Sequence, residues 1–375
     1  MTKKNILIMA GGTGGHIFPA LAIAEHLVKK GFHIEWLGTQ RGLEASLVPE
    51  HNYAINYIDI AGLRGKGLKS LLVLPFKLLR SMWQTIRIYR QIKPDVVLGL
   101  GGFVTGPGGV VAWLMAKPII LHEQNAIAGL TNKLLFHLAK KVFVAFPKAF
   151  KEHNKLALVG NPVREEIVKI GEPNSRLLKK WHDSLIAQLN ILVIGGSLGA
   201  VALNDKVPQA LELIIKDKSL ENSDFSQINI RHQCGKKHFD TTKKNYTELV
   251  KNKEKIIVEL SPFISNMAEQ YQWADIIICR SGALTISEIS AVGLASILVP
   301  YPYAVDDHQT ANAAYLVDEK AAFLIQQNDL SSKALADLLM TLNRDILLSM
   351  AVKARNLSIN NAAEIVANEC VKLAG

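Results

Sequence analysis

The chain has 375 residues, 49% hydrophobic and 20% charged, which excludes a disordered protein and predicts two domains. Lys and Arg outnumber Asp and Glu by 43 to 33, and this net charge of +10 favours partners that carry negative charge. No apolar run is long enough to span a membrane, and the three cysteines lack the paired spacing of a zinc site or a disulfide framework, so we expect a cytoplasmic protein.

Short apolar runs alternate with longer amphipathic segments along the first half of the chain. The runs are continuously hydrophobic, which is typical of parallel strands buried on both faces. A turn at 160–163, where Pro162 follows Gly160 and Asn161, predicts the junction between two domains. The expected strands of this half are 5–9, 33–37, 96–98, 119–122, 142–145 and 156–159.

Short apolar runs again alternate with amphipathic segments after the junction, and the pattern after Ser331 is helical to the end. Two such series predict an α/β protein with two doubly wound domains, whose ligands bind at the carboxyl ends of the strands. The expected strands of this half are 191–194, 228–232, 256–260, 276–279, 297–299 and 322–325.

Three glycine-rich loops, at 11–15, 101–106 and 195–199, each follow an expected strand. Such loops let the backbone approach a ligand, and the first N–H groups of the following helix suit an anion or a sugar oxygen. The first loop is not a dinucleotide fingerprint, because Ile17 occupies the position of the third glycine. No Walker-type phosphate loop occurs either.

Six motifs follow one another along the chain: Gly11-Gly12-Thr13-Gly14-Gly15-His16, Gly101-Gly102-Phe103-Val104-Thr105-Gly106-Pro107, His122-Glu123-Gln124-Asn125, Gly160-Asn161-Pro162-Val163-Arg164, Gly195-Gly196-Ser197-Leu198-Gly199-Ala200 and Arg280-Ser281-Gly282-Ala283-Leu284-Thr285-Ile286-Ser287-Glu288. Together they closely resemble the MurG family of peptidoglycan glycosyltransferases, from residue 5 to about 312. The family transfers N-acetylglucosamine from UDP-GlcNAc to the muramyl 4-hydroxyl of undecaprenyl-pyrophosphoryl-MurNAc-pentapeptide, which converts lipid I to lipid II. This is the last cytoplasmic step of peptidoglycan precursor synthesis.

The resemblance implies the GT-B fold, in which two Rossmann-like doubly wound domains face each other across a cleft. Residues 1–162 would form the acceptor- and membrane-binding domain, and residues 163–344 the UDP-GlcNAc-binding domain. The helices at about 345–375 would pack back on the first domain. The reaction would invert the anomeric carbon without a metal ion or other cofactor.

For the donor, the resemblance implies that Glu288 holds the ribose, Ser197 a phosphate, and Arg164 with the backbone of Ile264 the uracil. Gln309 would bind the sugar hydroxyls beside His308, where the family more often has a second glutamine. From the residues alone, Ser281 is expected to cap a helix that begins here and whose first N–H groups suit an anion. The full donor set is Thr13, Gly14, Gly15, Asn125, Arg164, Ser197, Ile264, Ala283, Leu284, Thr285, Ile286, Ser287, Glu288 and Gln309.

His16 ends the first glycine loop and is the first candidate for catalysis. A neutral imidazole suits a general base that takes the acceptor's proton, or a group that positions the acceptor. The alternative is a histidine that only binds the loop backbone. Glu123 and Asn125 end a strand and are the next catalytic candidates, as groups that orient the acceptor.

Residues 67–83 form an apolar segment that also carries cations. Leu72, Phe76, Leu79 and Trp83 repeat at helical spacing, flanked by Lys69 and Arg80. A basic amphipathic helix of this kind binds an anionic membrane surface, although an ordinary core-facing helix with a basic side has the same pattern. The resemblance implies a peripheral protein on the cytoplasmic face of the bacterial inner membrane, with other cell-wall synthesis and cell-division proteins as partners and roles in cell shape and the cell cycle.

Two other classes of protein fit part of the pattern. A UDP-N-acetylglucosamine 2-epimerase, or another GT-B transferase, shares the fold and a nucleotide-sugar ligand. A nucleic-acid-binding protein would explain the positive charge, but the cations are not interleaved with aromatic residues on a recognisable reading element, so no nucleic-acid partner is expected.

Overall fold

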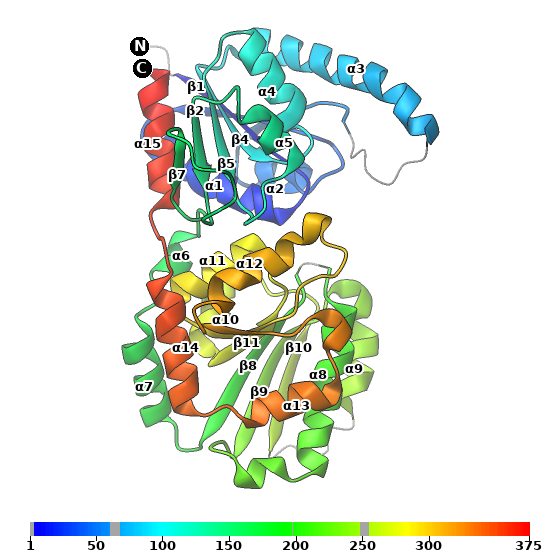
Figure 1. The fold of residues 1–375 in the computed structure, drawn as a ribbon, viewed down its shortest axis with the longest axis vertical. Coiled ribbons are helices and arrows are strands. Elements are labelled where there is room, and N and C mark those ends of the chain that lie inside the picture. The colour runs from blue at the N-terminus through cyan, green and yellow to red at the C-terminus, as the bar shows by residue number, and fades with distance from the viewer. Residues whose placement is uncertain (1–3, 61–67, 197, 248–254) are drawn as a thin grey trace. The chain divides into compact units, whose positions relative to one another are not determined.

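The computed structural model describes residues 4–60, 68–196, 198–247 and 255–375, apart from the side chains of residues 68–74 and 222. The chain divides into two compact units, the first formed by Met1–Arg164 with Ile359–Gly375 and the second by Glu165–Ser358. Each unit is built on its own parallel sheet (Figure 1).

The first unit has a seven-stranded sheet in the order β3-β2-β1-β4-β5-β6-β7, with all neighbours parallel. Its strands are β1 (Asn5–Ala10), β2 (His33–Gly38), β3 (Ala54–Tyr57), β4 (Val96–Gly101), β5 (Ile119–Glu123), β6 (Lys141–Val144) and β7 (Leu156–Leu158). Its helices are α1 (Gly14–Lys29), α2 (Glu44–Glu50), α3 (Leu68–Ile92), α4 (Thr105–Leu114), α5 (Leu130–Leu135) and α15 (Ala362–Ala374).

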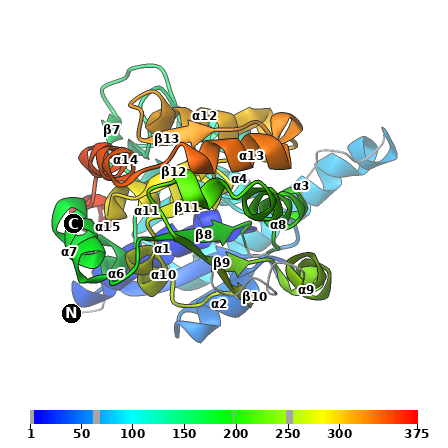
Figure 2. The ribbon, with the colours of Figure 1, turned by 90° about the horizontal axis from the view of Figure 1, so that it is seen from below.

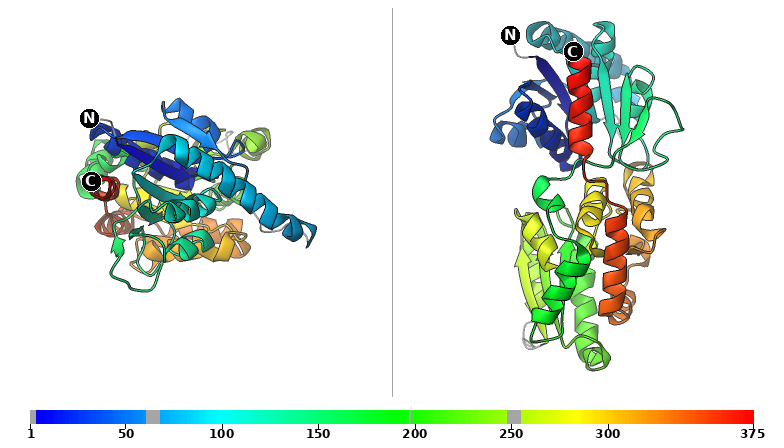
Figure 3. Two further views of the ribbon diagram at one scale, coloured as in Figure 1. Left: turned by 90° about the horizontal axis from the view of Figure 1, so that it is seen from above. Right: turned by 90° about the vertical axis from the view of Figure 1, so that its left-hand side faces the viewer.

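Alternate residues of β1 enter two different cores of this unit. Ile6 and Ile8 pack with the apolar sides of α1 and α15, whereas Leu7 and Met9 pack with residues of α3 and α4. Both faces of the sheet are therefore covered, which explains the continuous hydrophobicity of its central strands. Figure 3 shows α15 along the sheet, and α3 extending beyond the other elements of this unit.

The second unit has a six-stranded parallel sheet in the order β10-β9-β8-β11-β12-β13 (Figure 2). Its strands are β8 (Gln188–Ile194), β9 (Gln227–Gln233), β10 (Ile256–Ser261), β11 (Ile276–Cys279), β12 (Ala295–Leu298) and β13 (Ala322–Leu324). Its helices are α6 (Glu165–Val168), α7 (Pro173–Asp183), α8 (Val201–Lys216), α9 (Phe239–Thr247), α10 (Met267–Trp273), α11 (Ala283–Val292), α12 (His308–Val317), α13 (Ser332–Met340) and α14 (Arg344–Asn356).

The expected α/β class with two parallel sheets is confirmed, and each expected strand is present, with shifted ends in all but β11. β3 was not predicted from the sequence; it is a four-residue edge strand whose side chains are half-buried or exposed. Because such a strand needs no continuous apolar run, its sequence carried little signal.

The end of the chain differs from the expectation that residues from about 345 pack on the first domain. α14 belongs to the second unit, where Leu347, Met350 and Ala351 lie in the core. Only α15 returns to the first unit, and Val366 and Cys370 are fully buried there. Among the described residues, no helix has both the length and the apolar character needed to cross a membrane.

Candidate functional site

Each sheet reverses its strand order at one place. The reversal lies between β1 and β4 in the first unit and between β8 and β11 in the second. Doubly wound sheets bind ligands outside the carboxyl ends of the strands at this point. The glycine loops and the 280–288 motif follow these four strands, so these loops lie at the edge where each fold provides a site.

The glycine loop after β1 rests on the side chain of Glu44, which is fully buried. One carboxylate oxygen accepts a hydrogen bond from the backbone N–H of Gly12 at 2.9 Å, and the other accepts from the N–H and the hydroxyl of Thr39 at 2.9 and 2.8 Å. A Cβ atom on Gly102 would lie 2.4 Å from the carbonyl oxygen of Gly11, so the two glycine loops of this unit touch through their backbones. The carboxylate and this contact fix the loop that presents Thr13, Gly14 and Gly15.

His16 lies in the first turn of α1, half-buried against the end of β4. A Cβ atom on Gly101 would come within 2.8 Å of the imidazole Cε1, so the ring lies directly on the backbone there. Its Nδ1 is 2.9 Å from Oε1 of Gln124. The imidazole thus bonds a side chain of the loop after β5. The alternative interpretation required a bond to the backbone of its own loop instead.

His122 and Gln124 are buried at the carboxyl end of β5. His122 Nε2 donates to the carbonyl oxygen of Gly160 at 2.9 Å, and the Gln124 amide nitrogen lies 3.1 Å from His122 Nδ1. Burial, together with the neighbouring His16, lowers the pKa of His122 to about 4 despite the opposing bond to Gly160. His122 is therefore neutral near pH 7.

Glu123 is 2% exposed and uses both carboxylate oxygens within its own loop. Oε1 accepts from the backbone N–H and the side-chain amide of Asn125, and Oε2 accepts from the Gly129 N–H and the Asn132 amide at 3.0 and 2.9 Å. These bonds make Glu123 the organiser of the loop at 124–129. Asn125 is half-buried, and its side-chain amide donates to Glu123 Oε1 at 3.3 Å.

Arg164 is the last residue of the first unit, whereas the expected boundary placed it in the second domain. Its guanidinium carbon lies 5.8 Å from the centre of the Phe18 ring, in a cation–π contact with α1. The side chain is thus held in the first unit, beside the helix that carries His16.

The N-terminus of α11 carries the donor candidates Ala283, Leu284, Thr285, Ile286 and Ser287. The first N–H groups of a helix have no partner within it, and they face the end of the preceding strand β11. The expected cap is wrong: Gly282, with extended backbone angles, is the N-cap. Ser281 is fully buried instead, and its hydroxyl has no hydrogen-bond partner among the described residues.

Glu288 lies on α11 and is 6% exposed. The Tyr271 hydroxyl of α10 donates to Glu288 Oε2 at 2.8 Å. This bond fixes one carboxylate oxygen and orients the group, which suits an acceptor of ligand hydroxyls.

Gln233, at the end of β9, bridges two loops at the same edge of the second sheet. Its amide nitrogen donates to the carbonyl oxygen of Gly196 at 2.9 Å, and its Oε1 accepts from the backbone N–H of Ile264 at 2.8 Å. A ligand that bonds this N–H competes with Gln233. Ser197 lies outside the described residues.

Gln309 and His308 begin α12. Gln309 Oε1 accepts from the backbone N–H of Tyr301 at 2.9 Å, and His308 Nδ1 donates to the carbonyl oxygen of Val305 at 2.7 Å. The two preceding residues, Asp306 and Asp307, both have φ near +50°, a region that is costly for a residue with a side chain. The structure thus holds the start of α12 in a strained local conformation.

The predicted membrane segment lies on α3. Phe76, Leu79 and Trp83 are 73%, 64% and 62% exposed, so this part of the helix is not core-facing. The Arg80 guanidinium pairs with Asp59 at 2.8 Å, and both side chains are exposed. Lys69 and Leu72 lie in the helix, but their side chains are outside the described residues.

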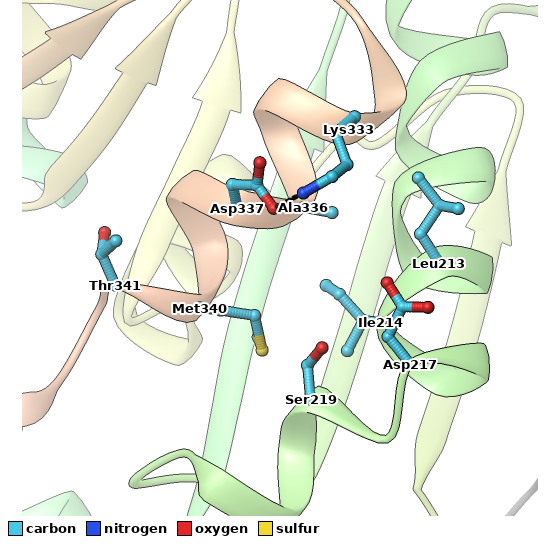
Figure 4. Close-up of a pocket in the computed structure, with 9 residues that line it drawn as sticks. All are labelled: Leu213, Ile214, Asp217, Ser219, Lys333, Ala336, Asp337, Met340 and Thr341. Carbon is cyan, nitrogen blue, oxygen red and sulfur yellow. Dashed lines mark hydrogen bonds and ion pairs between the residues drawn. The ribbon is translucent and has the colours of Figure 1, made fainter.

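A cavity of about 200 Å³ opens in the second unit between α8 and α13 (Figure 4). It is lined by Asp217 and Ser219, just after α8, and by Lys333 and Asp337, which form an exposed ion pair. Since α8 starts near the carboxyl end of β8 and runs back, its end lies at the amino edge of the sheet. The cavity is therefore at the edge opposite to the donor candidates.

Four residues were not predicted from the sequence to be functional: Glu44, Gln124, Gln233 and Tyr271. Gln124 stands inside a motif that was recognised, so its position was a usable signal. Gln233 and Tyr271 act on residues 17 or more positions away along the chain, and Glu44 joins the nearby Thr39 to the distant Gly12, so no local pattern marked them.

Two family models match the chain. The glycosyltransferase family 28 N-terminal domain matches residues 6–144, and the glycosyltransferase family 28 C-terminal domain matches residues 190–369. These two ranges contain both glycine loops of the first unit and the 280–288 motif of the second.

Relatives of the same length are found among curated proteins and solved structures. The chain is 49% identical, over 99% of its length and 98% of the relative's, to a UDP-N-acetylglucosamine–N-acetylmuramyl-(pentapeptide) pyrophosphoryl-undecaprenol N-acetylglucosamine transferase of Aeromonas hydrophila. It is 48% identical to the protein of the same name from Burkholderia ambifaria, over 100% of this chain and 97% of that one. The crystal structure of Acinetobacter baumannii MurG is similar with a TM-score of 0.82 and 40% identity, over 98% and 99% of the two chains.

A 2-epimerase also shares the fold. The structure of a UDP-N-acetylglucosamine 2-epimerase from Listeria monocytogenes, described as putative, is similar with a TM-score of 0.63 at 15% identity, over 97% of this chain and 95% of that one. At this identity the likeness shows a shared fold and nothing about activity.

Proposed function

Because the chain belongs to glycosyltransferase family 28, we propose that it transfers N-acetylglucosamine from UDP-GlcNAc to undecaprenyl-pyrophosphoryl-MurNAc-pentapeptide, converting lipid I to lipid II. The observation that carries this proposal is the full-length similarity to transferases with that name. The 2-epimerase shares the fold at 15% identity, and this much weaker similarity does not favour epimerisation.

The first unit supplies the base in this proposal. The muramyl 4-hydroxyl oxygen attacks the anomeric carbon of N-acetylglucosamine while His16 takes the hydroxyl proton. The bond from the anomeric carbon to the UDP phosphate breaks, and UDP leaves with the electron pair. A single displacement inverts the α-linked donor into a β-linked product. Thr13, Gly14 and Gly15 bring backbone N–H groups to this reaction, and Asn125 orients the acceptor.

The second unit binds the nucleotide in this proposal. The first N–H groups of α11, and the positive end of its helix dipole, stabilise the charge that develops on the leaving pyrophosphate. The Glu288 carboxylate, oriented by Tyr271, accepts hydrogen bonds from the ribose hydroxyls. Gln309 binds the sugar hydroxyls, Ser197 a phosphate, and Ile264 the uracil. Arg164 is proposed as a further uracil contact.

The exposed part of α3 attaches the protein to membrane in this proposal. Phe76, Leu79 and Trp83 form an apolar surface on a helix that also carries exposed Lys77 and Arg87. Apolar burial and attraction to anionic lipid act together in such helices. An acceptor with a polyprenyl tail lies in the same membrane, so attachment brings the enzyme to its substrate.

We place the reaction on the cytoplasmic face of the bacterial inner membrane. The product is a precursor of the cell wall, so the activity serves cell shape and cell division. Other cell-wall synthesis and division proteins are the expected protein partners.

The experiment that tests this function measures UDP release from UDP-GlcNAc with and without a short-chain lipid-linked muramyl-pentapeptide. We expect release to require the acceptor, and His16→Ala to lower kcat by about 100-fold or more, as expected for loss of a general base. His51→Ala, an exposed histidine of the same unit, is the matched control and should leave kcat unchanged. Consumption of UDP-GlcNAc without the acceptor would contradict the proposal and favour an epimerase.

A further inference from the structure

A chain of four polar groups runs through the first unit from the carbonyl oxygen of Gly160 to the imidazole of His16. Its links are His122 Nε2 to Gly160 O at 2.9 Å, Gln124 Nε2 to His122 Nδ1 at 3.1 Å, and His16 Nδ1 to Gln124 Oε1 at 2.9 Å. His122 and Gln124 are 0% and 1% exposed, so water does not compete for these bonds. Which atom donates in each bond follows from the carbonyl oxygen of Gly160, at the buried end of the chain of bonds.

The carbonyl oxygen of Gly160 only accepts, so His122 Nε2 carries a proton. Burial keeps His122 neutral near pH 7, with a pKa of about 4, so its single ring proton is on Nε2 and Nδ1 is an acceptor. An acceptor at Nδ1 requires the NH₂ of Gln124 to face it.

The second N–H of the Gln124 amide donates to the backbone carbonyl oxygen of His122 at 3.0 Å. A flipped amide would place Oε1 against two acceptors, Nδ1 and the carbonyl oxygen of His122, and would lose both bonds. The amide orientation is therefore fixed, with Oε1 toward His16. Because Oε1 is an acceptor, His16 Nδ1 carries the proton.

The ring of His16 is also fixed in place. It lies on the backbone of Gly101, where φ is +115° and a Cβ atom would approach Nδ1 to 3.0 Å. Within the described part of the chain, His16 Nε2 makes no hydrogen bond, so this nitrogen keeps a lone pair open to a ligand.

We propose that Gln124 and His122 are positioning residues that hold His16 in the Nδ1–H tautomer, so that Nε2 is the atom that takes the acceptor proton. The inference rests on the proposed role of His16 as the base. As the proton moves from the acceptor oxygen to Nε2, Gln124 Oε1 remains bonded to Nδ1–H and stabilises the imidazolium by its dipole. A neutral amide thus fills the place that a carboxylate occupies in a Ser-His-Asp triad.

The first test reads the tautomer directly and does not depend on activity. Long-range ¹H–¹⁵N correlation spectra of the ¹⁵N-histidine-labelled full chain distinguish protonated from unprotonated ring nitrogens, and His16→Ala assigns the His16 signals. We expect the wild type to show a protonated Nδ1 and an unprotonated Nε2 in His16 near pH 7.5. A proton on Nε2 would overturn the inference.

The second test replaces Gln124 by Met, which keeps the length of the side chain and removes both the donor and the acceptor. We expect kcat to fall at least about 10-fold, with both KM values within about 3-fold, because His16 then favours a proton on Nε2. The acid limb of the kcat–pH profile should move to lower pH, because the imidazolium loses its acceptor at Nδ1. The matched control is Gln91→Met, an exposed glutamine of the same unit. An unchanged kcat and pH profile in Gln124→Met would overturn the inference.

Two results keep this inference distinct from the proposed function. If Gln124→Met does not fold, the wild-type spectrum alone decides the tautomer. If the wild type transfers no sugar at all, the proposed function fails, while comparing the spectra of the wild type and of Gln124→Met still reports whether Gln124 sets the tautomer of His16.

Discussion

Glu44 gives a sharp test of how the first glycine loop is held. Its fully buried carboxylate accepts three hydrogen bonds, one from Gly12 and two from Thr39, at 2.8 to 2.9 Å. A bond to a charged group contributes about 1.5–3 kcal/mol, and the exposed Gly12 and half-buried Thr39 recover part of the loss by bonding water. We therefore expect Glu44→Ala to lower the free energy of unfolding of this unit by about 3–5 kcal/mol.

Glu44→Gln gives a graded version of the same test. Its carbonyl oxygen can keep both bonds to Thr39, but its NH₂ then faces the N–H of Gly12, so one charge-assisted bond is lost. The expected cost is about 1.5–3 kcal/mol. The exposed Glu50 at the other end of α2 is the matched control, and Glu50→Gln should change stability by less than about 0.5 kcal/mol.

Urea unfolding measures the global effect, and hydrogen exchange of the peptide that covers residues 11–16 measures local opening of the loop. Both Glu44 variants should speed exchange in this peptide more than in α15, which lies in the same unit. A loss below about 1 kcal/mol in Glu44→Ala, with unchanged exchange of the loop, would refute the view that this carboxylate fixes the loop.

Three further predictions concern the donor, the membrane and pH. Glu288→Gln should raise the KM for UDP-GlcNAc about 10- to 100-fold in steady-state assays, because it removes a charged acceptor of the ribose hydroxyls. Trp83→Ala with Leu79→Ala should weaken sedimentation with phosphatidylglycerol vesicles, whereas Leu178→Ala, an exposed apolar residue of the second unit, should not. Burial lowers the pKa of His122 from 6.5 to about 4, so the unfolded chain binds a proton more readily than the folded one. The resulting stability is complete above pH 6.5 and is lost as the pH falls toward 4, by about 1.4 kcal/mol between pH 7.5 and 5.5.

Each of these predictions has a result that would count against it. An unchanged KM for UDP-GlcNAc in Glu288→Gln would contradict the donor prediction. The membrane prediction would be contradicted if the protein bound phosphatidylcholine vesicles as well as phosphatidylglycerol vesicles, and if high salt did not weaken that binding. For His122, NMR titration of its ring should show no protonation between pH 7.5 and 5.5. A midpoint above pH 6 would show that burial does not hold this histidine neutral.

Much of the fold was predictable because buried parallel strands need continuous apolar runs, and such runs are local. β3 was not predicted because it is a short edge strand without a continuous apolar run. The last helices are both amphipathic, and only the tertiary structure shows that α14 packs in the second core and α15 in the first. An amphipathic pattern predicts that a helix packs against a core, but it does not predict which core.

The site was predictable in outline for the same reason. Glycine loops and a helix start mark the carboxyl ends of strands, and these ends meet at one edge of a parallel sheet. The sequence did not predict which hydrogen bonds the side chains at that edge make. Glu123 organises its own loop, Gln124 bridges two histidines, and Gly282 rather than Ser281 caps α11. The bond from Gln124 to His16 joins residues far apart in the chain, whereas the contacts of Glu123 and the cap of α11 are local and depend on the backbone conformation of each loop.

The central claim is transfer of a sugar to a lipid-borne hydroxyl, and the mass and stereochemistry of the product test it most directly. The wild-type protein is incubated with UDP-GlcNAc and a short-chain lipid-linked muramyl-pentapeptide, and the product is analysed by mass spectrometry and NMR. We predict an acceptor that gains one N-acetylglucosamine in β linkage, with one UDP released per product. An acceptor of unchanged mass, or an α-linked disaccharide, would contradict the account.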